Sequence, residues 1–166
     1  MTDSLSHFDR VPPAAPSAHL VWEALVDIAP REDLGTGPAG HRFIVPITGG
    51  SFRGAAGYEG FRGTVLAGGA DRQLLRPDGC KELDALYEMR LEDGGVITVR
   101  NSVVIDESSA GPRYAMSRIT LTVPQGPWEG LNKRLFIGTL QSARPEREAV
   151  IIRGWCVDTG PNAATT

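Results

Sequence analysis

Apolar and polar residues alternate along this chain in short segments, which is the pattern of half-buried β-strands. The clearest segment is residues 82–91, whose apolar residues fall on one side of the chain and whose charged residues fall on the other. A β-branched, apolar segment follows at residues 96–105, after the turn E-D-G-G. Because Asp-Gly tolerates positive φ, the two segments predict a β-hairpin. The apolar side of its first strand holds Leu83, Ala85, Tyr87 and Met89.

Other parts of the chain repeat the strand pattern less strictly. Residues 30–40 contain several glycines and prolines and are expected to form a loop, and one helical turn is expected at residues 128–133. Eight or nine short strands with frequent turns and no long amphipathic helix predict an all-β barrel or sandwich. The further expected strands are residues 19–28, 42–47, 60–66, 71–76, 114–123, 135–141 and 149–157.

Glycine doublets in residues 46–79 favour the barrel over the sandwich. Gly49-Gly50 and Gly68-Gly69 interrupt strand-like segments, and glycines at such places bend strands or admit another backbone or a ligand. Such bends curl a sheet into a closed barrel. We therefore expect one barrel domain at residues 18–158, a flexible leader at 1–17 and a flexible tail at 159–166.

Composition narrows the class of partner. The chain has 166 residues with a formal net charge of -3 and a pI of about 5.6, which argues against a nucleic acid or an anionic membrane. No apolar stretch approaches the ~20 residues that span a bilayer, and two cysteines fit a reducing cytoplasm. The three histidines and two cysteines lack metal-ligand spacing, so we expect no metal and no cofactor. A small-molecule ligand is the expected partner, and a homodimer or higher homo-oligomer stays open.

Asp71 is the first candidate for chemistry, because it follows a glycine doublet at the start of a strand. It is either a general acid or base at the barrel mouth or a turn residue whose carboxylate caps backbone amides. Glu88 and Arg90 share one strand face. Facing inward they would form a charged pair in a pocket, and facing outward a weak surface salt bridge. Leu86 lies between charges on the same face, so the pattern leaves both orientations open.

Four more residues are candidates for contacts with a ligand. Asn132 enters a strand from a loop and would either donate to a ligand oxygen or cap a turn. Trp128 and Tyr58 would line a pocket or belong to the core. Thr48, beside Gly49, would present a hydroxyl or satisfy a bend.

Six sequence motifs occur in a fixed order along the chain. They are Leu34-Gly35, Gly40, P-I-T-G-G-S-F-R-G at 46–54, G-x-V-L-x-G-G-A-D at 63–71, L-D…Y…D-G within 83–97, and L-N…F-I-G at 131–138. Their order resembles a bacterial and fungal family, domain of unknown function 3237, over roughly residues 19–157. The resemblance implies a small antiparallel barrel of calycin-like shape, a cytoplasmic location and a role in aromatic-compound or secondary metabolism. This chain has Arg72, Leu86 and Gly130 where the family pattern favours an aromatic, an arginine and an aromatic.

Together these features predict a small-molecule-binding barrel that is a cofactor-independent lyase, isomerase or cyclase. Its substrate would be a small oxygenated aromatic or polyketide-like compound. Asp71 would move a proton, and Arg90 and Asn132 would hold a developing oxyanion. Contacts to the substrate would come from Thr48, Tyr58, Glu88 and Trp128. The alternatives are a non-catalytic carrier or sensor of a small apolar ligand, and a structural subunit that pairs through a barrel face.

Overall fold

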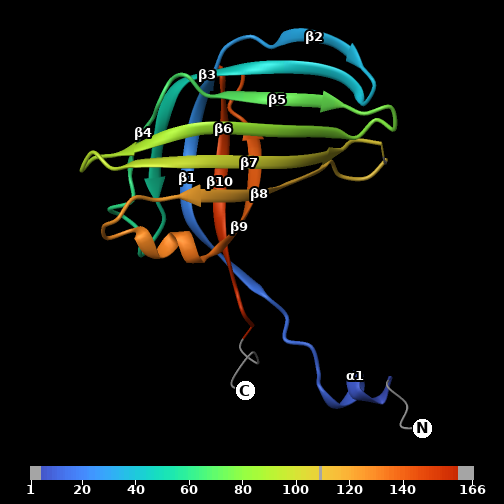
Figure 1. Cartoon of the computed structure of the whole chain (residues 1–166), viewed down its shortest axis with the longest axis vertical. Helices are drawn as coiled ribbons and strands as arrows, with labels where there is room; N and C mark the ends of the chain where they lie inside the picture. Colours follow the sequence, from blue (N-terminus) through green and yellow to red (C-terminus); the bar gives the residue numbers. More distant parts are fainter. Residues whose placement is uncertain (1–4, 109, 161–166) are drawn as a thin grey trace.

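The computed structural model describes residues 5–108 and 110–160. Within these residues nearly all regular structure is β-strand (Figure 1). No helix in the described part of the chain is long and apolar enough to cross a membrane. The elements in chain order are α1 (Ser6–Arg10), β1 (Ser17–Ile28), β2 (Glu32–Gly37), β3 (Gly40–Gly54), β4 (Gly63–Val65), β5 (Ala70–Leu75), β6 (Lys81–Leu91), β7 (Val96–Asp106), β8 (Tyr114–Thr122), the 3-10 helix η1 (Glu129–Lys133), β9 (Leu135–Ser142) and β10 (Ala149–Asp158).

The strands form a closed antiparallel barrel. Pairing runs β1-β10-β9-β8-β7-β6, continues through β4 and β5 to β3, and closes where β3 pairs with β1. Strands β4 and β5 pair with different halves of β3 and β6, so together they fill one position of an eight-stranded barrel. Strand β2 adds to the first half of β3. In Figure 1 strands β5 to β7 cross in front of β1, β9 and β10 at a steep angle.

A bend in β3 allows this closure, and glycine makes the bend. The first half of β3 pairs with β2 and β5, and its second half pairs with β1 and β4. The change of partners falls at Gly49 and Gly50, which have φ of 151° and 135°. A Cβ on Gly50 would lie 2.0 Å from the carbonyl oxygen of Leu25, so β1 and β3 approach this closely only with glycine there. The predicted role of this doublet in shaping the barrel is confirmed.

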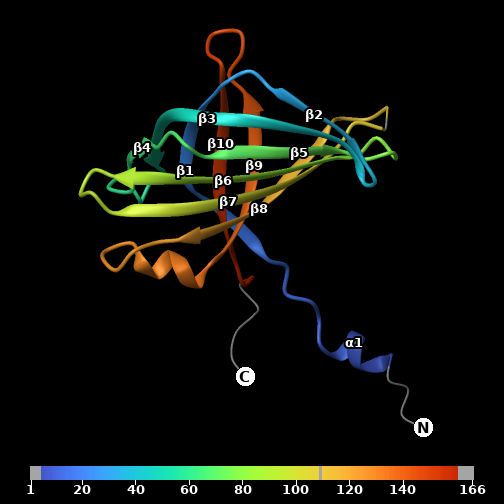
Figure 2. The ribbon, with the colours of Figure 1, turned by 45° about the horizontal axis from the view of Figure 1, so that its top comes forward.

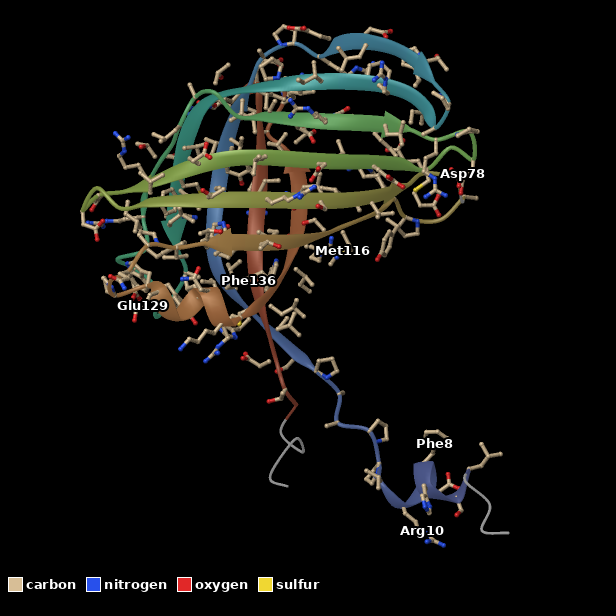
Figure 3. All side chains as sticks on the ribbon, viewed as in Figure 1. Phe8, Arg10, Asp78, Met116, Glu129 and Phe136 are labelled. Atoms are coloured by element: carbon tan, nitrogen blue, oxygen red, sulfur yellow. The ribbon has the colours of Figure 1, made fainter. Side chains whose placement is uncertain are left out.

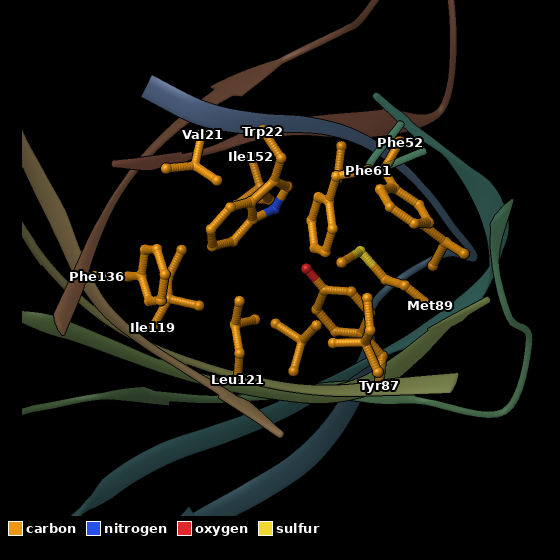
Figure 4. Packing of buried hydrophobic residues seen from close by; sticks show 14 of the residues in the cluster. Val21, Trp22, Phe52, Phe61, Tyr87, Met89, Ile119, Leu121, Phe136 and Ile152 are labelled. Atoms are coloured by element: carbon orange, nitrogen blue, oxygen red, sulfur yellow. The ribbon is translucent and has the colours of Figure 1, made fainter. Parts of the chain in front are cut away.

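The core fills one end of the barrel with aromatic side chains. Trp22, Phe61 and Phe136 are almost completely buried and meet edge to face, with ring centroids 5.2–6.1 Å from Trp22 (Figure 4). Tyr87 and Met89 close the cluster from β6. The two ends of the barrel are marked in Figure 3 by Glu129 in η1, next to this core, and by Asp78 in the β5–β6 turn. The aromatic core does not fill the Asp78 end of the barrel, where the pocket described below lies.

Most of the predicted elements are confirmed. The β6–β7 hairpin has the predicted turn, and Leu83, Ala85, Tyr87 and Met89 are buried as expected. The 3-10 helix η1 matches the expected helical turn, and α1 is an additional short helix. The expected loop at residues 30–40 is wrong, because β2 lies there. Strand β2 adds on to the barrel with mostly exposed side chains, so its sequence carries no apolar alternation.

Candidate functional site

A cavity of about 210 Å³ lies inside the barrel at the end away from η1. Side chains from every long strand except β8 line it. Arg113, the residue immediately before β8, also lines it. The lining is mainly aliphatic, with a few polar groups. The apolar residues are Val26, Ile28, Val45, Ile47, Leu83, Ala85, Val103, Ile105, Leu140, Val150 and Ile152, and the polar residues are Asp71, Gln73, Lys81, Tyr87, Asn101 and Arg113.

Strand register places Asp71 and Asn101 on either side of a small residue. Asp71 on β5 lies opposite Ala85 on β6, and Ala85 lies opposite Asn101 on β7. Directly paired residues point to the same face of a sheet, so all three face the interior. Because Ala85 has only a methyl group, the carboxyl and the amide face the cavity across an open gap. Two polar groups thus converge on one part of an otherwise aliphatic wall.

The turn before β5 fixes this register. The amide of Ile47 donates to Gly69 O at 2.9 Å, and the amide of Gly68 donates to Ile47 O at 3.2 Å, so the turn is tied to β3. A Cβ on Gly69 would lie 2.5 Å from the Cβ of Tyr87, so the turn packs directly on β6 only with glycine there. The second glycine doublet therefore sets the position of Asp71 two residues later.

Several buried polar atoms of the site have no protein partner. Among residues 5–108 and 110–160, no group hydrogen-bonds to Asp71 Oδ1 or to Asn101 Oδ1. The other carboxyl oxygen, Asp71 Oδ2, accepts a hydrogen bond of 2.8 Å from Gln73 Nε2. A buried polar atom without a partner costs roughly 1–3 kcal/mol. Two such atoms in one cavity are places where a water molecule or a polar group of a ligand can be held.

Two further orphaned polar atoms lie deeper, between the cavity and the core. These are Tyr87 Oη and Trp22 Nε1, neither of which has a partner within the described residues. Figure 4 shows the hydroxyl of Tyr87 pointing into the aromatic cluster, towards Trp22 and Phe61. Tyr87 therefore separates the cavity from the core: its ring lines the cavity, and its hydroxyl faces the core.

Burial raises the pKa of two ionisable groups in the wall, Asp71 and Tyr87. Loss of hydration raises the pKa of Asp71 above its ordinary value, and the hydrogen bond from Gln73 only partly opposes this effect. Loss of hydration also raises the pKa of Tyr87, which stays a neutral phenol. A carboxyl whose pKa is raised in a cavity can exchange protons nearer to neutral pH, as acid–base catalysis requires.

Positive charge lies at the rim of the cavity. Lys81 is half-buried and makes no ion pair with any described residue. Arg113 donates from Nε to Glu107 at 2.9 Å. The rim therefore offers Lys81 as a cation for an anionic group of a bound molecule.

The raised pKa of Asp71 predicts a pH-dependent cost in stability. Below its ordinary pKa of 3.8 the carboxyl is neutral in both the folded and the unfolded state. As pH rises through the raised folded-state pKa, the folded protein must ionise a poorly hydrated group, and stability is lost. We expect the free energy of unfolding of Asp71→Asn to exceed that of the native chain by a margin that grows from pH 4 towards neutral pH and then levels off. Urea unfolding across this pH range measures the margin.

Glu146→Gln provides the control for this measurement, because the carboxylate that it removes is exposed rather than buried. Its margin over the native chain should change little with pH. A margin for Asp71→Asn that stays constant or shrinks as pH rises would contradict the desolvated carboxyl.

The structure places the seven residues expected in a site at different parts of the barrel. Asp71 lines the cavity, and the other six do not. Thr48 is exposed on β3. Glu88 and Arg90 lie on the outer face of β6, because the residues that alternate with them, Tyr87 and Met89, are buried. The side chains of Glu88 and Arg90 therefore point away from the barrel interior, and they do not contact Asp71.

The remaining three candidates lie at the η1 end. Asn132 exchanges two hydrogen bonds of 2.8 Å with the backbone of Val123, the structural role left open for it. The rings of Tyr58 and Trp128 lie 6.3 Å apart and extend the aromatic core. An aromatic cluster does form, but away from the cavity.

The cavity also contains residues that the sequence analysis did not select. Asn101 is the most informative of them. It stands in the alternating apolar series of β7, which otherwise holds Ile97, Val99, Val103 and Ile105, and it is only 2% exposed. A polar residue in an apolar series is a signal that the sequence does contain. Lys81 gave no such signal, because polar residues are ordinary at strand ends, and Gln73 gave none because it follows two other polar residues, Asp71 and Arg72, in β5.

Fold and site together define a closed antiparallel β-barrel with a small internal pocket that holds a buried carboxyl. The chain belongs to the family described as protein of unknown function (DUF3237), whose model matches residues 16–157.

Curated relatives carry the name UPF0311 protein. One from Rhodopseudomonas palustris (strain TIE-1) is 41% identical over 101 residues, which are 61% of this chain and 59% of that protein. One from Clostridium acetobutylicum is 44% identical over 63 residues, 38% of this chain and 37% of that protein. The matched segments thus span less than two thirds of these relatives.

Solved structures share the fold over most of the chain. A conserved protein of unknown function from Rhodopseudomonas palustris is 26% identical with a TM-score of 0.76, covering 89% of this chain and 100% of that one. A β-barrel-like protein from Acinetobacter baumannii is 24% identical with a TM-score of 0.74, covering 89% and 99%. A protein described as an enzyme from Penicillium herquei is 22% identical with a TM-score of 0.69, covering 89% and 98%. At these last two identities the likeness shows the fold alone.

Proposed function

We propose that the barrel binds a small oxygenated, mostly apolar molecule and catalyses a proton transfer on it, with Asp71 as the base or acid and no cofactor. The reaction class is that of a lyase, isomerase or cyclase. One observation carries the proposal: a carboxyl with a raised pKa presents an unpaired, buried oxygen to an aliphatic cavity. A carboxyl that only shaped the fold would have its oxygens paired.

The size of the cavity limits the ligand. A volume of about 210 Å³ falls below the ~300–1,000 Å³ of pockets for drug-sized molecules. It exceeds the ~150 Å³ of an engineered cavity that holds benzene. One or two fused rings with a few oxygen substituents fit between these limits. The aliphatic walls favour such a ring system, and the polar atoms favour its hydroxyl or carbonyl groups.

A chemical step follows from the two polar groups that flank Ala85. Asp71 Oδ1, when ionised, takes a proton from a carbon next to a carbonyl of the ligand, and the electron pair moves to the carbonyl oxygen. The amide of Asn101 can donate a hydrogen bond to that oxygen as negative charge develops on it. Lys81 at the rim lowers the cost of the charge. Where the ligand has a C=C bond conjugated to the enolate, return of the proton from Asp71 to the far carbon of that conjugated system completes an isomerisation. Where the ligand has a second carbonyl instead, the enolate carbon attacks it to close a ring, and the new alkoxide takes the proton back from Asp71.

The comparisons are compatible with catalysis without establishing it. One barrel of the same fold, that of Penicillium herquei, is described as an enzyme. This lends support to a catalytic use of the scaffold, while the cavity of this chain must be tested by itself.

Isotope exchange tests the proposal with simple ketones in place of the natural substrate. The purified protein is incubated in deuterated water with a panel of one- and two-ring hydroxyketones and cyclic ketones, and deuterium at the carbon next to the carbonyl is followed by NMR. We expect protein-dependent exchange for members that fit the cavity. Members that bind, by thermal shift or calorimetry, but never exchange above the rate in buffer would overturn the catalytic proposal.

A non-catalytic carrier or sensor is the second candidate. It is favoured by the lining itself, because eleven of the seventeen lining residues are apolar. A carrier needs only this surface and the opening. A ligand that copurifies with the protein and is released unchanged would support the carrier.

A further inference from the structure

Three side chains with metal-ligating atoms converge at the end of the barrel opposite the pocket. The imidazole of His19, the thiol of Cys156 and the carboxylate of Asp158 offer one ligand atom each, and these atoms all lie within 4.8 Å of one another. His19 is seven residues before Val26 on β1, about 23 Å along the strand from the pocket wall. Both strand ends lie where the chain enters and leaves the barrel (Figure 2). The cluster is therefore separate from the candidate site.

Strand register creates the cluster. His19 on β1 lies directly opposite Cys156 on β10, and Asp158 follows Cys156 by two residues. Opposite residues and residues two apart on one strand share a face, and cross-strand Cβ atoms are about 4.5–5.5 Å apart. Three ligands from two neighbouring strands can therefore surround one ion. Because His19 and Cys156 are far apart in sequence, their spacing gave no metal signal, and the absence of a metal was the expectation.

The distances suit a small transition-metal ion after minor adjustment. His19 Nδ1 lies 2.7 Å from Asp158 Oδ2, and Cys156 Sγ lies 4.0 Å from Asp158 Oδ1. Zinc bonds of about 2.0–2.3 Å place tetrahedral ligand atoms about 3.3–3.8 Å apart. The His19–Asp158 pair must therefore open by several tenths of an ångström, and ligand atoms that lie as far as 4.8 Å apart must close by about 1 Å or more. Side-chain rotation supplies such movement, because His19 and Asp158 are 45% and 43% exposed.

The other nitrogen of His19 already has the support that metal-binding histidines have. His19 Nε2 lies 3.0 Å from the hydroxyl of Tyr58, and the two rings are stacked with centroids 6.0 Å apart. With Nε2–H donating to the tyrosine oxygen, removal of the proton that Nδ1 shares with Asp158 turns the lone pair of Nδ1 towards Cys156 and Asp158. Histidines that ligate metals almost always donate their second N–H in this way. This contact is independent of the three-ligand cluster and also points to an ion.

We propose that His19 Nδ1, Cys156 Sγ and Asp158 together bind one divalent transition-metal ion of the zinc type, with the fourth position open to solvent. Binding displaces a proton from the thiol and also the proton on His19 Nδ1, which passes to solvent or to Nε2, so the hydrogen bond between His19 and Asp158 breaks. A thiolate and an imidazole select such ions over Mg²⁺ and Ca²⁺. The ion joins the first strand, β1, to the last strand, β10, near the point where the chain enters and leaves the barrel, and the proposal does not depend on the function of the pocket.

Cobalt substitution tests this site directly, because a thiolate bound to Co²⁺ gives an intense charge-transfer band in the near ultraviolet. The full chain, freed of metal by a chelator, is titrated with Co²⁺ and then with Zn²⁺. We expect the band to saturate at one equivalent and to disappear when Zn²⁺ displaces Co²⁺. Calorimetry should give the same stoichiometry, and Mg²⁺ should not compete. Failure of the native chain to give a saturable band would overturn the proposal, whatever the variants do.

The chain offers a matched control, because it has two cysteines. Cys156→Ser should abolish the band, and Cys80→Ser, at the β5–β6 turn, should keep it. Tyr58→Phe should weaken binding by about 10–100-fold with the band retained. Cys156 is buried, so Asp158→Asn, on the exposed side, provides a second variant if Cys156→Ser does not fold. A band that survives both Cys156→Ser and Asp158→Asn, or that is lost in Cys80→Ser, would contradict the assignment.

Discussion

Asp71→Asn is expected to lower the rate of the proposed proton transfer by about 10²–10⁴-fold, the usual contribution of a positioned general acid or base. The substitution keeps the size of the side chain, and its amide oxygen can still accept the hydrogen bond that Gln73 donates to Asp71. Ligand affinity should therefore change little while turnover is lost. Exchange rates from deuterated water, together with calorimetric affinities for the same ligand, measure the two effects separately.

The pH profile gives this prediction a second readout. If ionised Asp71 is the base, kcat/KM of the native protein should rise with pH through the raised pKa of that carboxyl. Glu146→Gln, a change at an exposed loop residue, should keep both the rate and the profile. Equal exchange rates for Asp71→Asn and the native chain would remove Asp71 from the mechanism and leave the carrier as the better proposal.

Local sequence patterns predicted the parts of the barrel that local chemistry determines. The β6–β7 hairpin followed from strict alternation and an Asp-Gly turn, and both strands are paired along nearly their full length. The bend at Gly50 followed from a glycine doublet inside a strand. Asp71 follows from a signal of the same kind, because it stands at the start of a strand after the second glycine doublet. Each of these features is contained in one continuous stretch of the chain.

Features set by long-range register could not be predicted in the same way. The partners of Asp71 in the cavity wall are determined by pairing across β5, β6 and β7. Arg90 and Asn132 were placed beside Asp71 from chemistry alone, and the structure gives them an outward face and a backbone contact instead. The facing direction of Glu88 and Arg90 depends on which side of β6 is the core. That becomes certain only when Tyr87 meets the aromatic cluster from β1.

The largest effect on stability is expected at Trp22, the largest side chain of the buried aromatic core. We expect Trp22→Ala to lower the free energy of unfolding by about 3–5 kcal/mol, the usual cost of removing a buried large aromatic residue. The indole is completely buried and packs edge to face on Phe61 and Phe136. Its ring also lies directly on Gly154, where a Cβ would meet it at 2.2 Å. Urea unfolding monitored by far-ultraviolet circular dichroism measures the loss.

Trp22→Phe separates packing from polarity at the same position. The indole Nε1 is buried with no partner among the described residues, and phenylalanine removes this unpaired donor while keeping one aromatic ring. Its cost should therefore be much smaller than that of Trp22→Ala, because the relief of an orphaned polar group, roughly 1–3 kcal/mol, offsets part of the lost packing. Equal losses for the two variants would contradict this expectation, because Nε1 would then be hydrogen-bonded in solution rather than unpaired.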